Sequence, residues 1–193
     1  MKTIKKITVA AFILASLIGY ANEDKKTTNN KAKKTVKLVF NNVKKGQILS
    51  IRDEQGFELY NNKIKNSGNY SKIFDFSALK DGIYSAELNK DFKIITKKVI
   101  VENGLVTFLN NKNETEFKPV IRTKNNLLYI SKLAFNPESI KVTIYYKETA
   151  IFSETLKDKK YLKRIYKLSE NEIGKYTVII DTKDRYFVKD FTL

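Results

Sequence analysis

The densest group of charged side chains in the sequence is a basic run in its last quarter. It holds five basic residues within eight positions: Lys157, Lys159, Lys160, Lys163 and Arg164. Tyr161 lies among them, and basic side chains near an aromatic ring are typical of contacts with anionic polymers. A solvated loop has the same composition, so both interpretations stay open.

The whole chain shares this basic character. Its 193 residues carry 37 Lys and Arg against 21 Asp and Glu, a formal net charge of +16. Four of the basic residues are arginines, at positions 52, 122, 164 and 185. Arginine grips phosphates and bases with a planar fork, whereas lysine acts as a point charge. The candidate polymers are therefore an acidic glycan, lipopolysaccharide or extracellular DNA, with nucleic acid the least favoured.

The residue types give little support to catalysis. The chain has no histidine, cysteine or tryptophan, which excludes His-based triads, Cys nucleophiles, disulfides and metal sites built on His or Cys. No spacing among Asp53, Glu54, Asp81 and Glu154 singles out an acid–base pair. The seven glycines are scattered singly, without a phosphate-binding loop. We predict a protein that is not an enzyme, with no catalytic residue, metal or cofactor.

The first residues are typical of an export signal. A basic start precedes an apolar run, Ile7–Ile18, that is too short to cross a membrane. Gly19 and Ala21 supply the small residues that precede a cleavage site. We predict a signal peptide over residues 1–21 and a disordered spacer over residues 22–35, with no transmembrane segment in the mature chain. The protein is then exported to the periplasm, the outer surface or the medium.

The rest of the chain contains two similar segments. At an offset of 92 positions, Gly82–Tyr84 aligns with Gly174–Tyr176, and the surrounding apolar positions coincide while the charged ones differ. This is the pattern of two copies that keep one type of core. We predict two modules, over residues 36–111 and 112–193.

Both modules have the pattern of β-strands, with short alternating segments rich in β-branched and aromatic residues. The predicted strands are Val36–Phe40, Ile48–Arg52, Lys72–Phe76, Ile83–Leu88, Phe92–Val101, Val106–Phe108, Phe117–Arg122, Leu127–Leu133, Ile140–Tyr146, Ala150–Leu156, Leu162–Leu168, Tyr176–Ile180 and Arg185–Leu193. The sequence predicts a type I′ hairpin turn at Asn103-Gly104, and helical turns are suggested only at Ser77–Lys80 and Ser169–Ile173. The fold class is therefore all-β, with two tandem immunoglobulin-like (fibronectin-III-like) antiparallel β-sandwich modules.

Two tyrosines occupy equivalent places in the modules. Tyr84 and Tyr176 each follow a glycine by two positions, at the start of a predicted strand. In immunoglobulin-like domains a tyrosine at such a place bonds back to the preceding corner. The cysteine that follows in antibody domains is replaced by Ala86 and Val178. We predict that both tyrosines are structural and that the hydrophobic core alone joins the sheets.

Three segments of the first module resemble a known family: Leu49–Gly56, Phe76–Tyr84 and Thr96–Val99. They look like the immunoglobulin-like C-terminal sorting domains of the type IX secretion system, and like tandem modules of exported proteins in bacteria that use that route. The resemblance implies an immunoglobulin-like fold and export, and it implies no catalytic residues.

The sequence leaves three functions open. The first is a non-catalytic exported protein whose modules mediate protein–protein contact in the cell envelope or outside the cell. The second is a binding module for an anionic polymer, and the third is a type IX secretion cargo or sorting domain. The first is favoured, because the leader, the duplication and the missing catalytic residues all agree with it.

Overall fold

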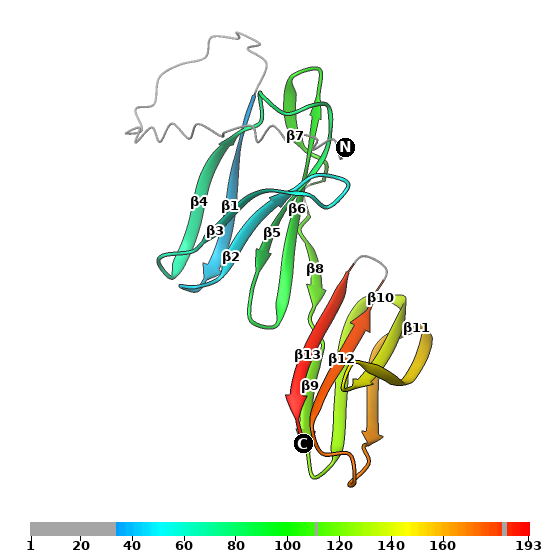
Figure 1. Cartoon of the computed structure of the whole chain (residues 1–193). Helices are drawn as coiled ribbons and strands as arrows, with labels where there is room; N and C mark the ends of the chain where they lie inside the picture. Colours follow the sequence, from blue (N-terminus) through cyan, green and yellow to red (C-terminus); the bar gives the residue numbers. More distant parts are fainter. Residues whose placement is uncertain (1–33, 111, 183–184) are drawn as a thin grey trace, which may run out of the picture. The chain divides into compact units, whose positions relative to one another are not determined.

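The computed structural model of the chain describes residues 34–110, 112–182 and 185–193 (Figure 1). The predicted signal peptide and residues 22–33 of the predicted spacer lie outside this part. All thirteen elements that the structure describes are β-strands. The segments Ser77–Lys80 and Ser169–Ile173 form non-helical turns. Within the described residues there is accordingly no helix with the length and apolar character needed to span a membrane.

The first module is built from two antiparallel sheets. One pairs β1 (Thr35–Val43) with β4 (Gly68–Asp75). The other has the order β3–β2–β5–β6–β7, with β8 also pairing with β6. Its strands are β2 (Ile48–Arg52), β3 (Glu58–Lys63), β5 (Gly82–Asn89), β6 (Lys93–Glu102), β7 (Leu105–Phe108) and β8 (Glu114–Phe117). β8 thus pairs with the first module, although it follows residue 111.

The core of this module lies between the two sheets. Leu38 of β1 and Phe74 of β4 are buried together with Leu49 of β2 and Leu88 of β5. Along β1 as far as Phe40, and along β5 from Tyr84 to Leu88, every second residue is buried, because successive side chains of a strand point to opposite faces. Two sheets that share one core in this way form a β-sandwich, which confirms the predicted fold class.

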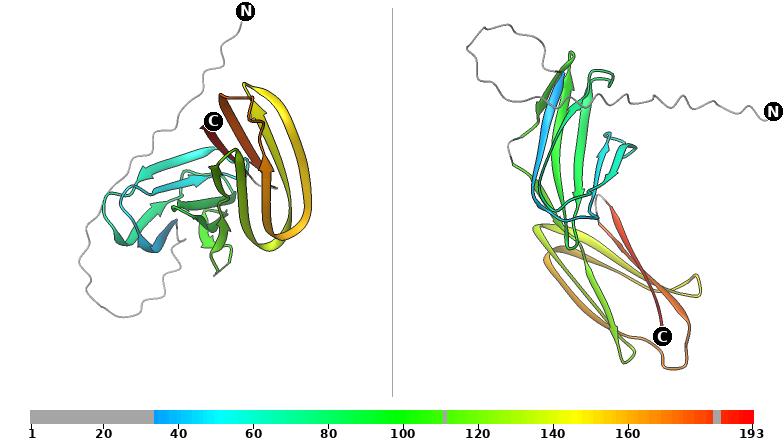
Figure 2. Two further views of the ribbon diagram at one scale, coloured as in Figure 1. Left: turned by 90° about the horizontal axis from the view of Figure 1, so that it is seen from below. Right: turned by 90° about the vertical axis from the view of Figure 1, so that its left-hand side faces the viewer.

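Two long strands dominate the second module. Its strands are β9 (Val120–Lys124), β10 (Leu127–Tyr146), β11 (Thr149–Lys167), β12 (Lys175–Asp181) and β13 (Tyr186–Thr192). β10 and β11 run side by side as a bent hairpin (Figure 2), with register shifts between Leu133 and Ile140. Before the bend β10 pairs with β9, and after it β10 pairs with β12, which pairs with β13. β10 therefore joins the predicted strands Leu127–Leu133 and Ile140–Tyr146, and β11 joins Ala150–Leu156 and Leu162–Leu168. The two halves of these strands enclose a core separate from that of the first module.

The pairing register of β5 with β6 in the first module matches that of β12 with β13 in the second. Tyr84 of β5 lies opposite Val99 of β6, and Tyr176 of β12 lies opposite Phe191 of β13. Both pairs are related by the offset of 92 positions found in the sequence. Residues that align between the two copies in the sequence therefore occupy equivalent positions in the two sheets.

The hairpin between β6 and β7 has the predicted turn. Glu102 pairs with Leu105, which leaves a two-residue loop. Asn103 and Gly104 have φ angles of 51° and 74°, the left-handed values that a type I′ turn requires. This prediction is confirmed.

Candidate functional site

The outer face of one sheet of the second module combines exposed apolar and basic side chains. This sheet consists of β9, the first half of β10 and the second half of β11. Its strand register places the outward residues in four rows: Lys124, Leu127 and Lys167; Arg122, Tyr129 and Ile165; Val120, Ser131 and Lys163; Leu133 and Tyr161. We call these eleven residues the basic–aromatic face. The alternate residues, such as Leu128, Ile130 and Leu162, are buried in the core.

Three apolar side chains lie exposed close together on this face. The exposed fraction is 59% for Tyr161, 54% for Ile165 and 44% for Leu133. A hollow of about 600 Å³ lies over the sheet and is lined by residues of all three strands, Tyr129 and Lys163 among them. Because contiguous exposed apolar patches mark interaction sites, the face is the best candidate site among the described residues.

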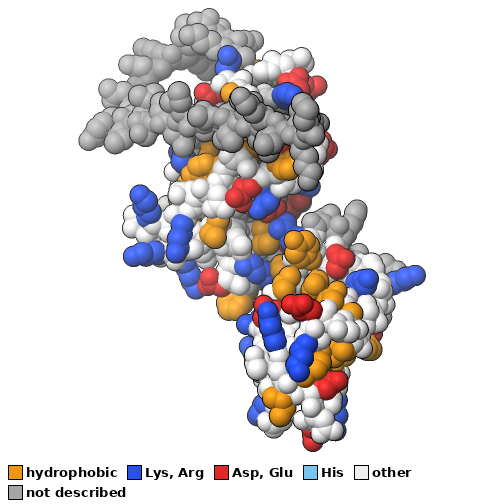
Figure 3. All heavy atoms as spheres, in the orientation of Figure 1, with side chains coloured by type: hydrophobic (Ala, Val, Ile, Leu, Met, Phe, Trp, Pro, Cys, Tyr) orange, Lys and Arg blue, Asp and Glu red, His pale blue; other side chains and the backbone are white. Residues whose placement is uncertain are grey.

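The charge of the face is positive. Arg122, Lys124, Lys163 and Lys167 are all exposed, and none of its four rows contains an acid. Lys167 lies 4.0 Å from the exposed Glu170 at the rim, a geometry that contributes little in water. The face therefore offers point charges beside apolar surface. Elsewhere the basic side chains are dispersed over the visible surface (Figure 3).

The predicted basic run is divided by the strand on which it lies. Lys163 belongs to the face, whereas Arg164 points to the other side of β11, where its Nε donates to Glu154 at 3.1 Å. Lys157 and Lys160 are exposed nearer the bend, and the side chain of Lys159 lies outside the described part. The run is thus not one cluster, because alternate residues of a strand point to opposite faces.

The sequence alone did not indicate the part of the site that lies on β9. Arg122 and Lys124 lie about forty residues before Lys163, and only the pairing of β9 with β10 and of β10 with β11 brings them to one face. A weak signal was present, because basic residues occupy alternate positions of this short strand.

Glu154 is held by two hydrogen bonds. Tyr166 donates its hydroxyl proton to Glu154 Oε1 at 2.5 Å, and Arg164 Nε donates to the same oxygen. Burial, together with the hydrogen bond to Glu154, raises the pKa of Tyr166. The carboxylate thus has a structural role at the edge of the core.

The other acids considered as catalytic candidates lie in turns. Asp53 accepts the backbone N–H of Phe57 at 2.8 Å, and Asp81 accepts that of Asn103 at 3.0 Å. Glu54 is exposed in the turn before β3. Over residues 34–110, 112–182 and 185–193 no three acidic side chains gather as a metal site would require.

The two tyrosines of the repeat make matching hydrogen bonds. Tyr84 donates its hydroxyl proton to the carbonyl of Lys80 at 2.7 Å, and Tyr176 donates to the carbonyl of Glu172 at the same distance. In both copies the acceptor lies four residues before the tyrosine. Burial raises the pKa of both hydroxyls, which therefore stay protonated donors at neutral pH.

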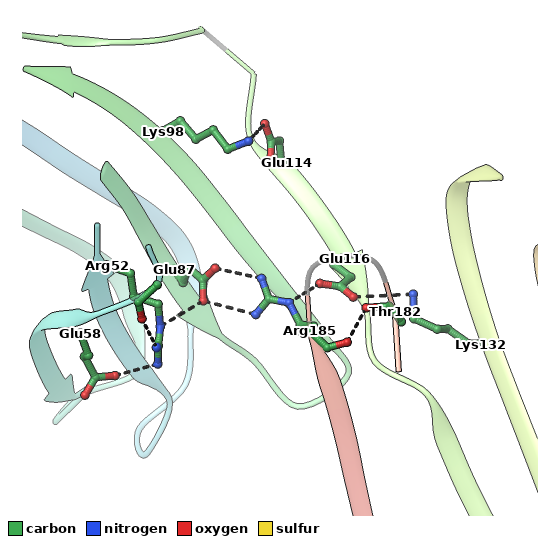
Figure 4. A network of polar contacts seen from close by, with 10 residues as sticks. Arg52, Glu58, Glu87, Lys98, Glu114, Glu116, Lys132, Thr182 and Arg185 are labelled. Carbon is green, nitrogen blue, oxygen red and sulfur yellow. Dashed lines mark hydrogen bonds and ion pairs between the residues drawn. The ribbon is translucent and has the colours of Figure 1, made fainter. Parts of the chain in front are cut away.

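A chain of ion pairs joins strands of the two modules (Figure 4). Arg185, in the turn before β13, binds Glu87 of β5 at 2.9 Å and Glu116 of β8 at 2.5 Å. The chain continues from Glu87 to Arg52 at 3.8 Å and from Glu116 to Lys132 at 3.7 Å. The side chain of Lys132 is only 1% exposed. Since each charge has a partner of opposite sign, this network is a structural contact.

Part of the chain is similar to a known family. Residues 26–102 match the family model of the secretion system C-terminal sorting domain. This segment is similar to a sorting domain. The sorting-domain match includes all three segments that carried the resemblance in the sequence, which confirms that resemblance. It extends through the end of β6 and stops before the second module.

Other comparisons add little. A search of curated proteins gave no match. Among solved structures, the chain is similar to one described as "Biofilm associated protein - BSP domain", with a TM-score of 0.28 and 11% sequence identity. The similarity covers 83% of this chain and 27% of the other, so this chain spans about a quarter of that protein's length.

Proposed function

We propose that this chain is a non-catalytic exported protein whose immunoglobulin-like modules act by contact with a partner in the cell envelope or outside the cell. The basic–aromatic face is the observation that carries this proposal. Tyr161, Leu133 and Ile165 are exposed together on one face with four basic side chains, and such a contiguous patch supports a contact role. The sorting-domain match of residues 26–102 supports export.

A contact role also agrees with how the acids are used. Asp53 and Asp81 accept backbone N–H groups of turns, and Glu154 holds Tyr166 and Arg164. None of these carboxylates faces the hollow of the basic–aromatic face. The face therefore offers binding groups without a proton donor or acceptor suited to general acid–base catalysis at neutral pH.

The test is retention of the exported chain at the cell surface. The double variant Tyr161→Ser/Ile165→Ser removes the exposed apolar side chains of the face. A Phe92→Ser variant is the matched control, because Phe92 is 72% exposed and lies in the first module. We expect the double variant to shift from the cell fraction to the medium while the control stays cell-associated. Equal partition of all three proteins would show that the face has no contact role.

The sorting-domain match favours a second candidate function, type IX secretion sorting. A reporter placed ahead of the chain, after a signal peptide, would then reach the cell surface in a bacterium with that system. In a strain that lacks the system, the same fusion should accumulate in the periplasm. Identical distribution in both strains would exclude a sorting role and leave the contact role unaffected.

A further inference from the structure

We propose that the basic–aromatic face binds an acidic polysaccharide that lies across β9, β10 and β11. This inference rests on the contact role proposed above and names the chemical class of the partner. Its basis is the size of the face, the alternation of charge and apolar surface on it, and the kinds of apolar side chain present.

The face has the size for a linear polymer. Strands lie about 4.8 Å apart and outward residues recur about every 7 Å along a strand, so three strands and four rows cover roughly 10 Å by 20 Å. A stable protein–protein interface takes about 20–30 residues from each side, whereas the face has eleven. A single extended polymer needs no larger contact.

Charges alternate with apolar side chains along the face. On β11, Lys163 stands between Tyr161 and Ile165, and in the next row Tyr129 lies between Arg122 and Ile165. A sugar ring has an apolar C–H face and polar edges. The C–H face can pack on a tyrosine or aliphatic side chain while a carboxylate or sulfate on the edge reaches Lys163 or Arg122. The positive charge, unopposed by acids in these rows, selects an acidic sugar.

The apolar side chains favour a polysaccharide over single-stranded nucleic acid. Bases bind by stacking on aromatic rings, and successive bases need successive rings. Here the two tyrosines are separated along the strands by four positions, or about 13 Å, and the row between them holds Val120, Ser131 and Lys163. Aliphatic side chains lie beside the rings, Ile165 opposite Tyr129 and Leu133 opposite Tyr161. Aliphatic surface serves the C–H faces of sugars but gives a base no partner for stacking.

The proposal is tested by binding of the purified full chain to polygalacturonate, a carboxylated polysaccharide. Neutral dextran and single-stranded oligo-dT of similar length serve as comparison ligands. We expect binding to polygalacturonate, none to dextran, and weaker binding to oligo-dT. Affinity should fall as salt rises, with a log–log slope no steeper than about −3 if the four basic residues of the face make the contacts.

Matched variants separate the face from the general charge of the chain. The double variant Arg122→Gln/Lys163→Gln should lower the affinity about tenfold, because two charge contacts are lost. The control Lys37→Gln/Lys141→Gln removes the same charge at exposed positions outside the face and should change the affinity less than twofold. Tyr161→Ala should weaken binding several-fold, and circular dichroism shows whether each variant is folded.

Three outcomes would overturn the proposal. Equal loss of affinity in the two double variants would show that the dispersed charge, and not the face, binds the polymer. Tighter binding of oligo-dT than of polygalacturonate would identify nucleic acid as the ligand. Absence of binding to polygalacturonate would reject the ligand class, while the cell-retention assay decides separately whether the face has a contact role.

Discussion

Arg185 donates two hydrogen bonds to the carboxylate of Glu87, which lies 98 positions earlier in the chain, at 2.9 and 3.3 Å. The two side chains are only 26% and 14% exposed, so solvent screens the pair less than a surface ion pair. Both carboxylate oxygens are engaged, a bidentate geometry that is among the stronger ones for arginine. The pair therefore contributes to the association of β5 with the turn before β13.

A double-mutant cycle measures that contribution. We expect Arg185→Gln and Glu87→Gln each to lower the free energy of unfolding, and the coupling between them to be about 1–2 kcal/mol. Urea denaturation of the four proteins gives the value. Lys44 and Asp91, 3.0 Å apart but with side chains 68% and 49% exposed, form the control pair and should show no measurable coupling. Equal coupling in both pairs would contradict the role of burial.

The hydrogen bonds of Tyr84 and Tyr176 predict that replacing either tyrosine by phenylalanine lowers stability at neutral pH. Tyr176 is fully buried, and its hydroxyl bonds to the carbonyl of Glu172. Tyr176→Phe removes this bond and leaves a carbonyl without its donor, which should cost about 1 kcal/mol of unfolding free energy. Tyr84→Phe should cost a similar amount, because its bond has the same length. Urea denaturation at pH 7 checks both values.

The raised pKa of Tyr176 predicts how the stability difference between wild type and Tyr176→Phe depends on pH. Burial raises the pKa of Tyr176 above its ordinary value near 10, so the folded state holds this proton more tightly than the unfolded state does. The resulting stability is complete below pH 10 and is lost as the pH rises through the folded pKa. The advantage of wild type over Tyr176→Phe should therefore shrink as the pH rises above 10. An advantage that stays constant above pH 10 would show that the pKa of Tyr176 is the same in the folded and unfolded states.

Alternation and duplication were enough to predict the fold class, because apolar positions at a period of two identify most strands. Two strands were missed. Glu114–Phe117 lies in a polar segment, and the single strand predicted over Phe117–Arg122 was wrong, because the chain leaves one strand at Phe117 and begins the next at Val120. Glu58–Lys63 has mostly polar residues, and its only apolar ones, Leu59 and Tyr60, are partly buried. Its counterpart was found because Ile151 and Phe152 stand in an apolar segment. The continuity of β10 and β11 through the bend was also missed, since it depends on pairing that persists where the apolar pattern is interrupted.

The candidate site was predictable only in part. The basic run drew attention to Lys163, but a run along a strand alternates between two faces, which is why Arg164 lies on the other side with Glu154. Other members of the site, such as Arg122 and Tyr129, reach it through strand pairing. Such long-range register is not recorded in local sequence.

The contacts of Glu154 predict a change in the ionisation of Tyr166. Burial is the larger cause of the raised pKa of Tyr166, and the hydrogen bond and charge of Glu154 raise it further. Glu154→Gln removes the negative charge and should lower this pKa, which should still stay above the ordinary value near 10 because the burial remains. NMR titration of the tyrosine ring carbons measures it. An unchanged pKa in the variant would contradict a contribution from the carboxylate.

The two hydrophobic cores predict separate responses to core truncation. Leu88 and Ile180 occupy equivalent positions in the repeat, and both are fully buried, but they belong to clusters that share no residue. Leu88→Ala or Ile180→Ala should each cost about 2–5 kcal/mol, because the lost methyl groups leave a cavity. Hydrogen exchange shows where the stability is lost: Leu88→Ala should speed exchange in β1–β6, and Ile180→Ala should speed it in β10–β13. If either variant accelerated exchange equally in both sets of strands, the modules would unfold as one cooperative unit. The ion pairs of Arg185, which join the modules, would then be the first contacts to remove by mutation.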